Sequence, residues 1–285
     1  MASLTEQADT SGFPDWTCRL ERLADEDLHG YRQESHYGVL WLEELVKGTA
    51  ELDFVHLQLG PAQALFWAPG QICRFDLAKA SGWRLEFGLD TFCQSGLDDA
   101  LLESLGLFAP LTDSPLLKIP PAEMAELTQI LRWWEKDNTL TARWHRQLAG
   151  SYLRLLLLRC GQLADRPRLL PAIGESEIWP RFRQLLESQF RRWHQVSNYA
   201  DALAVTPGHL NELVRQASGR SAKRVIQERL MLEARRAAWF SQDSLKQIAY
   251  DLGFEDPAYF SRLFRRCSGQ NFTDFRNRIR EKQGS

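Results

Sequence analysis

Two short stretches of the chain place polar side chains at helical spacing, and these side chains can hydrogen-bond to the edges of DNA bases. Arginine suits the acceptors of guanine, asparagine pairs with adenine, and glutamate accepts from the amino group of cytosine. Small residues near the start of each stretch would let a helix approach the bases closely. The candidate base-reading residues are Gly208, Asn211, Glu212 and Arg215 in the first stretch and Ala258, Tyr259, Ser261, Arg262 and Arg265 in the second.

The two stretches are copies of one helix-turn-helix unit. Apolar residues of the first copy recur in the second about 50 residues later, with one residue added in the turn. Thr206-Pro207 and Asp256-Pro257 each place an N-cap acceptor before a proline that suits the first helical position. Recognition helices are therefore predicted over about 206–217 and 257–267. Their predicted buried faces are Leu210, Leu213, Val214 and Ala217 in the first copy and Phe260, Leu263, Phe264 and Cys267 in the second.

A helix predicted over about 222–240 connects the two units. Its roughly nineteen residues would span ~28 Å at ~1.5 Å per residue. Successive major-groove faces on one side of B-DNA lie ~34 Å apart. A rigid connection of this length can hold two recognition helices in adjacent grooves, so that one chain reads two segments of the duplex.

Charge is divided unevenly along the 285 residues, although the formal net charge is only −2. Residues 181–285 contain 19 Lys and Arg against 11 Asp and Glu, whereas residues 1–180 contain 16 against 26. A basic module attached to an acidic one is typical of nucleic-acid-binding proteins. The alternative interpretation is a chance distribution of solvated surface charge.

Residues 248–269, IAYDLGFEDPAYFSRLFRRCSG, resemble the signature of AraC/XylS-family transcriptional regulators almost position for position. RLMLEARRA resembles the linker helix of that family, and VTPGHLNELVRQASGRS resembles its first helix-turn-helix unit. One departure follows Gly269, where the family usually carries a proline and this chain has Phe272. The resemblance covers about 183–281, and the matching signature positions are Ile248, Ala249, Gly253, Phe254, Tyr259, Phe260, Arg262, Phe264, Arg265, Arg266 and Gly269.

The resemblance implies a sequence-specific transcription regulator, an activator that binds double-stranded DNA, acts with RNA polymerase and forms a homodimer. It implies no enzymatic activity and no cofactor. Side chains at helix starts and on the linker helix would hold DNA phosphates, which position a protein without specifying sequence. The candidates for this role are Thr206, Lys223, Arg224, Arg235 and Arg266.

The chain is predicted to form β structure from about residue 28 to 95, because short β-branched and aromatic segments alternate with turn residues. Strands at this spacing suggest a sandwich or small barrel, and LGPAQALFWAPGQICRFD resembles the cupin-like sensor domain common in the family. No metal site is expected, because His36 and His56 are isolated. A barrel can enclose a small-molecule effector, and Arg74 suggests a carboxylate or phosphate. The candidate pocket residues are His36, Trp41, Trp67, Arg74 and Phe87, although these aromatics can equally be core.

The predicted fold is α+β with two domains: an N-terminal cupin-like β-barrel with a helical dimerisation region, and a C-terminal all-α double helix-turn-helix domain. The helices predicted near 121–164 can join two copies or pack against the chain's own barrel. The predicted divisions are 1–100 for the sensor domain, 101–164 for the helical dimerisation and packing region, 165–180 for a proline-containing linker, and 181–285 for the DNA-binding domain.

The five cysteines are scattered and lack CxxC-type spacing, which argues against a disulfide framework or a structural zinc site. This usage suggests a reducing cytoplasm. MASLTEQADT lacks the apolar region of a signal peptide, and SYLRLLLLRC is too short and too charged to cross a bilayer. We therefore expect a cytoplasmic protein with no membrane partner.

Two other functions fit parts of the pattern. A cupin-type enzyme with a helical appendage would need a cluster of metal ligands that the sequence lacks. An RNA-binding or chromatin-like protein without sequence preference would carry uniform basic stripes. Asn211, Glu212 and Ser261 favour discrimination between bases instead.

Overall fold

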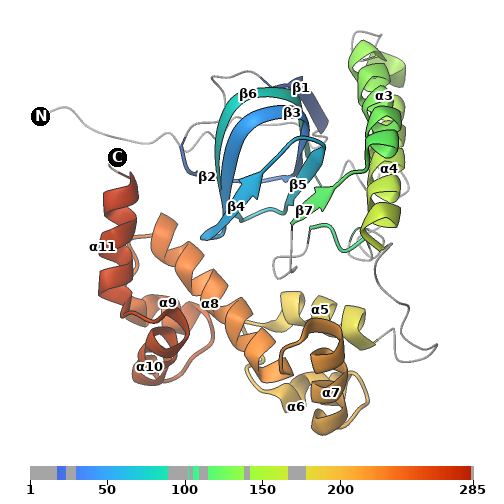
Figure 1. Cartoon of the computed structure of the whole chain (residues 1–285). Helices are drawn as coiled ribbons and strands as arrows, with labels where there is room; N and C mark the ends of the chain where they lie inside the picture. The colour runs from blue at the N-terminus through green and yellow to red at the C-terminus, as the bar shows by residue number, and fades with distance from the viewer. Residues whose placement is uncertain are drawn as a thin grey trace, which may run out of the picture.

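The computed structural model describes residues 18–23, 30–88, 102, 105–108, 115–137, 142–165 and 178–283. Its N-terminal part is rich in strands and its C-terminal part is helical, as predicted (Figure 1). Most of the predicted linker, 165–180, lies outside the described residues. None of the helices in the described ranges is long and apolar enough to cross a membrane.

The described strands form one antiparallel sheet. Two sixteen-residue strands, β3 (Tyr37–Leu52) and β6 (Ile72–Phe87), pair along their length and form its centre. A Cβ at Gly82, where φ is 151°, would collide with the carbonyl oxygen of Trp41, so only glycine fits at this close approach of the two strands. The strands β1 (Cys18–Arg22) and β2 (Arg32–Gln33) pair with β6. The strands β4 (Val55–Leu59) and β5 (Gln63–Trp67) pair with β3, and β7 (Leu116–Lys118) pairs with β5.

The sheet is curled (Figure 1), but the strands that the structure describes do not close into a barrel. Hydrogen bonding runs in the order β1-β6-β3-β5-β7, and within these strands no pairing joins β1 to β7. The prediction of a sheet-rich N-terminal domain is confirmed, although its two central strands are far longer than the short strands that the sequence suggested. The predicted closure into a cupin-like barrel is not confirmed.

Two helices, α3 (Pro121–Asp137) and α4 (Ala142–Asp165), lie along one side of the sheet (Figure 1). The Trp41 indole on β3 donates a hydrogen bond to Thr128 Oγ1 on α3 at 3.2 Å. The inner sides of the predicted dimerisation helices are therefore packed on the chain's own sheet. The core on this face includes Val39, Phe66, Trp83, Phe87, Leu127, Leu131, Trp134, Leu153 and Leu157.

Residues 178 to 283 fold into seven helices around one apolar core. The predicted caps are confirmed: Thr206 Oγ1 accepts from His209 N at 3.2 Å, and Asp256 Oδ1 accepts from Ala258 N at 2.8 Å. The helices are α5 (Ile178–Gln189), α6 (Val196–Ala202), α7 (Pro207–Ser218), α8 (Ala222–Phe240), α9 (Leu245–Asp251), α10 (Pro257–Ser268) and α11 (Phe272–Gln283).

The helices α7 and α10 match the predicted recognition helices closely, and both end at a glycine with left-handed backbone, Gly219 and Gly269. Their buried faces are shorter than predicted. Ala217 and Cys267 are exposed, because each lies in the last turn, where the helix has left the core. The connecting helix α8 has the predicted 19 residues.

Candidate nucleic-acid interface

The two candidate recognition helices are held toward opposite ends of α8. Figure 1 shows α6 and α7 at the N-terminal end of α8, and α9 to α11 toward its other end. Leu210 and Val214 of α7 and Phe260 and Phe264 of α10 are buried in the common core. These apolar contacts fix which side of each recognition helix faces outward.

The outward face of α7 carries Gly208, Glu212 and Arg215, all exposed. A Cβ at Gly208 would meet nothing within 4 Å, so the glycine leaves this end of the helix open toward solvent. Thr206, a candidate phosphate ligand, uses its hydroxyl oxygen as the N-cap acceptor of α7. Its hydroxyl hydrogen can still be donated to a phosphate oxygen.

Asn211 lies on the same stripe but serves a purpose that the sequence pattern did not reveal. Its side-chain oxygen Oδ1 accepts a hydrogen bond from the backbone N–H of Ala222 at 3.1 Å, and the residue is half-buried. Ala222 is the first residue of α8, so this bond joins the recognition helix to the connecting helix. Bidentate pairing with adenine would have to share this oxygen with the Ala222 N–H, which constrains the base-reading role predicted for Asn211.

The outward face of α10 carries the exposed residues Ala258, Tyr259, Arg262 and Arg265, with Ser261 half-buried beside them. Arg262 Nη2 lies 3.7 Å from Asp256 Oδ2, and both side chains are more than half exposed. An exposed pair of this kind contributes little to stability. Arg262 can therefore turn from Asp256 to a base edge at small cost, and Asp256 is kept in place by its cap to Ala258.

The candidate phosphate ligands fall into two groups. Lys223 and Arg266 are exposed, and Arg224 is also exposed but holds Glu228 Oε1 through its Nε at 2.8 Å. Arg235 differs from these three because it is half-buried at the boundary between the N-terminal domain and α8. Burial lowers the pKa of its guanidinium.

Several arginines that contribute to the basic charge of residues 181–285 are used inside the protein. Arg229 is buried and bonds to Glu187 on α5 at 2.8 Å and to Glu233 on α8 at 3.0 Å. Arg191 also donates to Glu233, at 2.8 Å. The Arg229–Glu187 pair fastens α5 to α8. Because these arginines are paired with glutamates of the same chain, the surplus of positive charge exposed to a DNA duplex is smaller than the sequence count indicates.

The five candidate residues of a pocket in the sheet are not brought together. Trp41 and Phe87 belong to the core beneath α3 and α4, whereas Trp67 belongs to the core on the other face of the sheet. Arg74 is exposed, with its guanidinium 5.2 Å from the centre of the Tyr31 ring. His36 is half-buried and its Nδ1 lies 2.9 Å from Ser35 Oγ. Core packing accounts for the three aromatic residues, which is the other interpretation that the sequence allowed.

The tip of the β3–β4 hairpin is fastened to α8 by a buried ion pair. The Asp53 carboxylate accepts two hydrogen bonds from Arg236, at 2.9 and 2.6 Å, and both side chains are buried. It also accepts from Gln71 Nε2 at 2.7 Å and from Ile72 N at 3.2 Å. We call this contact the hairpin latch. Bidentate geometry and full pairing of the carboxylate are the conditions under which a buried ion pair is well formed.

Aromatic side chains surround the hairpin latch. Phe54, next to Asp53 at the hairpin tip, lies 5.6 Å from the ring centre of Trp239 on α8 and 5.6 Å from that of Phe275 on α11. Tyr31 lies 4.6 Å from the Trp239 ring centre. The two domains are therefore joined through the helix that carries both recognition helices.

Residues 199–278 match a family model described as a helix-turn-helix domain. Similar curated proteins include the HTH-type transcriptional activator RhaR of Yersinia pseudotuberculosis, 25% identical over 159 residues, which are 55% of this chain and 54% of that protein. The arabinose operon regulatory protein of Escherichia coli K12 is 28% identical over 153 residues, 49% of this chain and 47% of that protein. The chain spans about half the length of the curated relatives it matches.

Solved structures of similar proteins include unsaturated fatty acid bound ToxT of Vibrio cholerae, 15% identical, which covers 92% of this chain and 94% of that one with a TM-score of 0.41. The C-terminal domain of AraT, a response regulator of Geobacillus stearothermophilus, is 24% identical and covers 36% of this chain and 87% of that one, with a TM-score of 0.34.

Proposed function

We propose that this chain is a transcription regulator of the AraC family that binds double-stranded DNA sequence-specifically with α7 and α10, which the match to a helix-turn-helix domain supports. The observation that carries this proposal is the repeated unit: two capped helices, each with one buried apolar face and one exposed polar face, are mounted on α8. A helix-turn-helix presents its second helix to the major groove. Two such helices on one rigid support suit two successive groove segments.

The proposed division of labour follows from what each helix exposes. On α10, Arg262 and Arg265 are suited to guanine, and Ala258 and Tyr259 border them at the helix start. On α7, Glu212 and Arg215 are the exposed members of the predicted base-reading stripe whose side chains can hydrogen-bond to bases. Lys223, Arg224 and Arg266 would hold phosphates and set the register of the protein on the duplex.

For the N-terminal part we propose a cupin-like sensor that responds to a small effector and controls the DNA-binding domain. The hairpin latch supports this role, because it gives the N-terminal domain a direct hold on α8. We propose the same divisions that the sequence suggested: 1–100, 101–164, 165–180 and 181–285. The helix α5 starts at Ile178, three residues before the last of these divisions.

We also propose that the protein is a cytoplasmic homodimer that activates transcription with RNA polymerase. Exposed apolar side chains on the outer sides of α3 and α4 support self-association, among them Trp133 and Leu155, 52% and 46% exposed. The alternative of a cupin-type enzyme with a helical appendage has no comparable support, because the relatives that the chain resembles are named as transcription regulators.

Selection of bound duplexes from random DNA by the full chain would test the proposed function. We expect an enriched site with two conserved blocks whose centres are about 10–10.5 base pairs apart, the repeat of the major groove on one side of the duplex. Enrichment of a single block would contradict the use of both recognition helices. A failure to enrich any sequence at low salt, where protein–DNA binding is strongest, would contradict the proposed function.

A further inference from the structure

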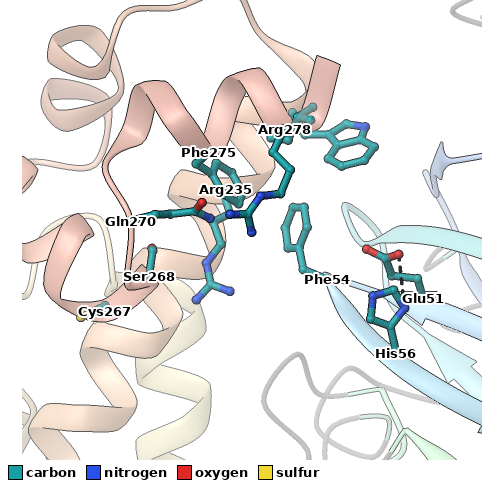
Figure 2. A pocket seen from close by; sticks show the side chains of 11 residues that line it. Glu51, Phe54, His56, Arg235, Cys267, Ser268, Gln270, Phe275 and Arg278 are labelled. Carbon is teal, nitrogen blue, oxygen red and sulfur yellow. Dashed lines mark ion pairs between the residues drawn. The ribbon is translucent and has the colours of Figure 1, made fainter. Parts of the chain in front are cut away.

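A cavity of about 290 Å³ lies at the boundary between the domains, where the β3–β4 hairpin meets α8, the end of α10 and α11 (Figure 2). Three aromatic side chains form its apolar walls: Phe54 from the hairpin, Trp239 from α8 and Phe275 from α11. The volume is at the lower end of the range for sites that bind small organic molecules.

Three polar atoms in the wall of this cavity are buried and have no hydrogen-bond partner within the described ranges. They are Arg235 Nε, Ser268 Oγ and Gln270 Oε1. Buried polar groups in proteins are nearly always paired, and leaving one unpaired is costly. The three atoms come from α8, the last residue of α10 and the turn before α11, so they converge on one space from three parts of the chain.

On the side of the DNA-binding domain, the charged residues that line the cavity are cationic. Figure 2 shows the side chains of Arg235 and Arg278 on the side of the helices, across the cavity from Glu51 and His56 of the hairpin. Glu51 on the hairpin side is engaged, because its carboxylate accepts from the Tyr31 hydroxyl at 2.7 Å and lies 3.4 Å from His56 Nδ1. Burial lowers the pKa of Arg235, as expected for a guanidinium whose burial is not fully offset by an opposite charge.

We propose that this cavity binds a small organic anion, with a carboxylate or phosphate head between Arg235 and Arg278 and an apolar body against Phe54, Trp239 and Phe275. Guanidinium groups donate well-directed hydrogen bonds to both kinds of head group. Ser268 and Gln270 supply further polar contacts, since the Gln270 amide can present either its oxygen or its nitrogen. A DNA phosphate is the other source of an anion for Arg235, but the hairpin residue Phe54 forms one wall of the cavity, which favours a small molecule.

The site is separate from the pocket predicted within the sheet, and it lies beside the hairpin latch. Arg235 of the cavity and Arg236 of the latch are consecutive residues of α8. An occupied cavity would therefore add contacts between the hairpin and the helix that carries both recognition helices. This consequence for DNA rests on the proposed function, whereas the binding of the anion does not.

Calorimetry on the full chain without DNA would test the binding. Benzoate and phenyl phosphate are the probes, benzamide is the neutral control, and inorganic phosphate represents the head group alone. We expect saturable binding of benzoate or phenyl phosphate and none of benzamide, and the preferred probe identifies the head group. Arg235→Gln and Arg278→Gln should each weaken binding about tenfold or more, because each removes a charge-assisted hydrogen bond. Arg280→Gln, on the same helix as Arg278 but outside the cavity wall, should leave binding unchanged.

Two further measurements separate a ligand site from a structural role of Arg235. Without a probe, Arg235→Gln should melt at the same temperature as the parent or higher, because it removes a buried cation that lacks full compensation. Cys267 lines the cavity and is exposed, so a bound probe should slow its alkylation.

Equal binding by the parent, Arg235→Gln and Arg278→Gln, or no saturable binding of either probe, would overturn the proposal. If Arg235→Gln weakened DNA binding but left probe binding intact, a DNA phosphate would be its anion. If the probes bind and no DNA sequence is selected, the proposed function fails and the anion site remains.

Discussion

At the scale of single residues, similar side chains on equivalent stripes have different tasks. Arg262 on α10 is exposed, and its contact to Asp256 is long, so it is available for a base. Asn211 on α7 occupies the position equivalent to Ser261, but its amide oxygen is bonded to the first residue of α8. The two recognition helices are therefore unequal: α10 exposes more cationic side chains, and α7 is more firmly tied to its support.

Changing Arg262 to Ala should relax base preference at one position of the site and cost ~1–3 kcal/mol of specific binding free energy. Lys223→Ala is the matched control, since loss of a phosphate contact should weaken binding about equally on all sequences and reduce the salt slope by about 1. Titrations of specific and random duplexes at several salt concentrations would measure both effects. An equal loss on specific and random DNA for Arg262→Ala would show that this residue does not read a base.

Changing Asn211 to Ala should lower the free energy of unfolding by about 1 kcal/mol, because the N–H of Ala222 loses its acceptor at the start of α8. Asn211→Asp keeps an acceptor at the same place, and its negative charge suits a helix N-terminus, so it should restore the stability. Urea unfolding of the three proteins would measure the difference. A shift of base preference in Asn211→Ala at unchanged stability would favour the base-reading role predicted from the sequence.

At the scale of elements, α8 combines the roles of spacer, core helix and point of attachment for the N-terminal domain. Its buried residues include Ala222, Val225, Ile226, Leu230 and Ala238, which pack into the common core. On another side it carries Arg229, which is fastened to α5 through Glu187 and is also paired with Glu233 of α8 itself. Burial alone would raise the pKa of Glu233, but the surrounding Arg229, Arg191 and Arg236 outweigh it and hold that pKa below its usual value.

This lowered pKa makes the stability of the protein depend on pH on the acid side. A carboxyl group with a lowered folded-state pKa contributes stability that is present above its unfolded pKa of about 4.3 and is lost as the pH falls through the folded value. As the pH is lowered from about 5 to about 3, the melting temperature of Glu233→Gln should therefore fall less than that of the parent. At pH 5 the melting temperature of Glu233→Gln should be the lower of the two. Thermal melts across this range would show it, with Glu255→Gln, at an exposed position before α10, as the control. An equal fall in melting temperature at acid pH for the parent and Glu233→Gln would show that Glu233 does not cause this pH dependence.

At the scale of the whole molecule, the two domains are joined by side chains and not only by the connecting chain. Asp53 and Arg236 are 183 residues apart in the sequence, and their bidentate contact is buried. Phe54 extends the contact to α8 and α11 through Trp239 and Phe275. The orientation of the N-terminal domain is therefore fixed relative to the recognition helices in this state of the protein.

Breaking the hairpin latch from one side should be more harmful than removing it entirely. Asp53→Ala takes the bidentate carboxylate away from the buried Arg236 and leaves it the long contact to Glu233 at 3.9 Å. Removing one partner of a buried ion pair typically costs ~3–5 kcal/mol. The double change Asp53→Ala with Arg236→Leu should recover part of this loss, because an apolar pair can replace a buried ion pair at little cost. Urea unfolding of the full chain, together with limited proteolysis between the domains, would measure the two variants. Equal stability of the single and double variants would show that Arg236 finds another partner or water.

The repeat, its caps and the length of α8 could be predicted from sequence because they depend on local signals. Thr206-Pro207, Asp256-Pro257 and the terminal glycines specify their helices within a few residues of chain. The hairpin latch could not be predicted, since Asp53 follows an ordinary strand pattern and nothing near it indicates an arginine 183 residues later. The aromatic residues of the candidate pocket could not be assigned from the sequence for a related reason. Alternation along a strand shows that two residues share a face of the sheet, but it does not show whether that face lines a cavity or packs in a core.

The hairpin latch also limits how freely the two halves of this protein could be exchanged during evolution or by design. A fusion of residues 178–283 to a foreign sensor would leave Arg236 and Trp239 without the hairpin that covers them. The donor would have to supply a carboxylate and an aromatic ring at the tip of one of its own turns, at the same distance from the linker. In this chain, compatibility between sensor and DNA-binding domain is therefore encoded in a few side chains at the tip of one hairpin.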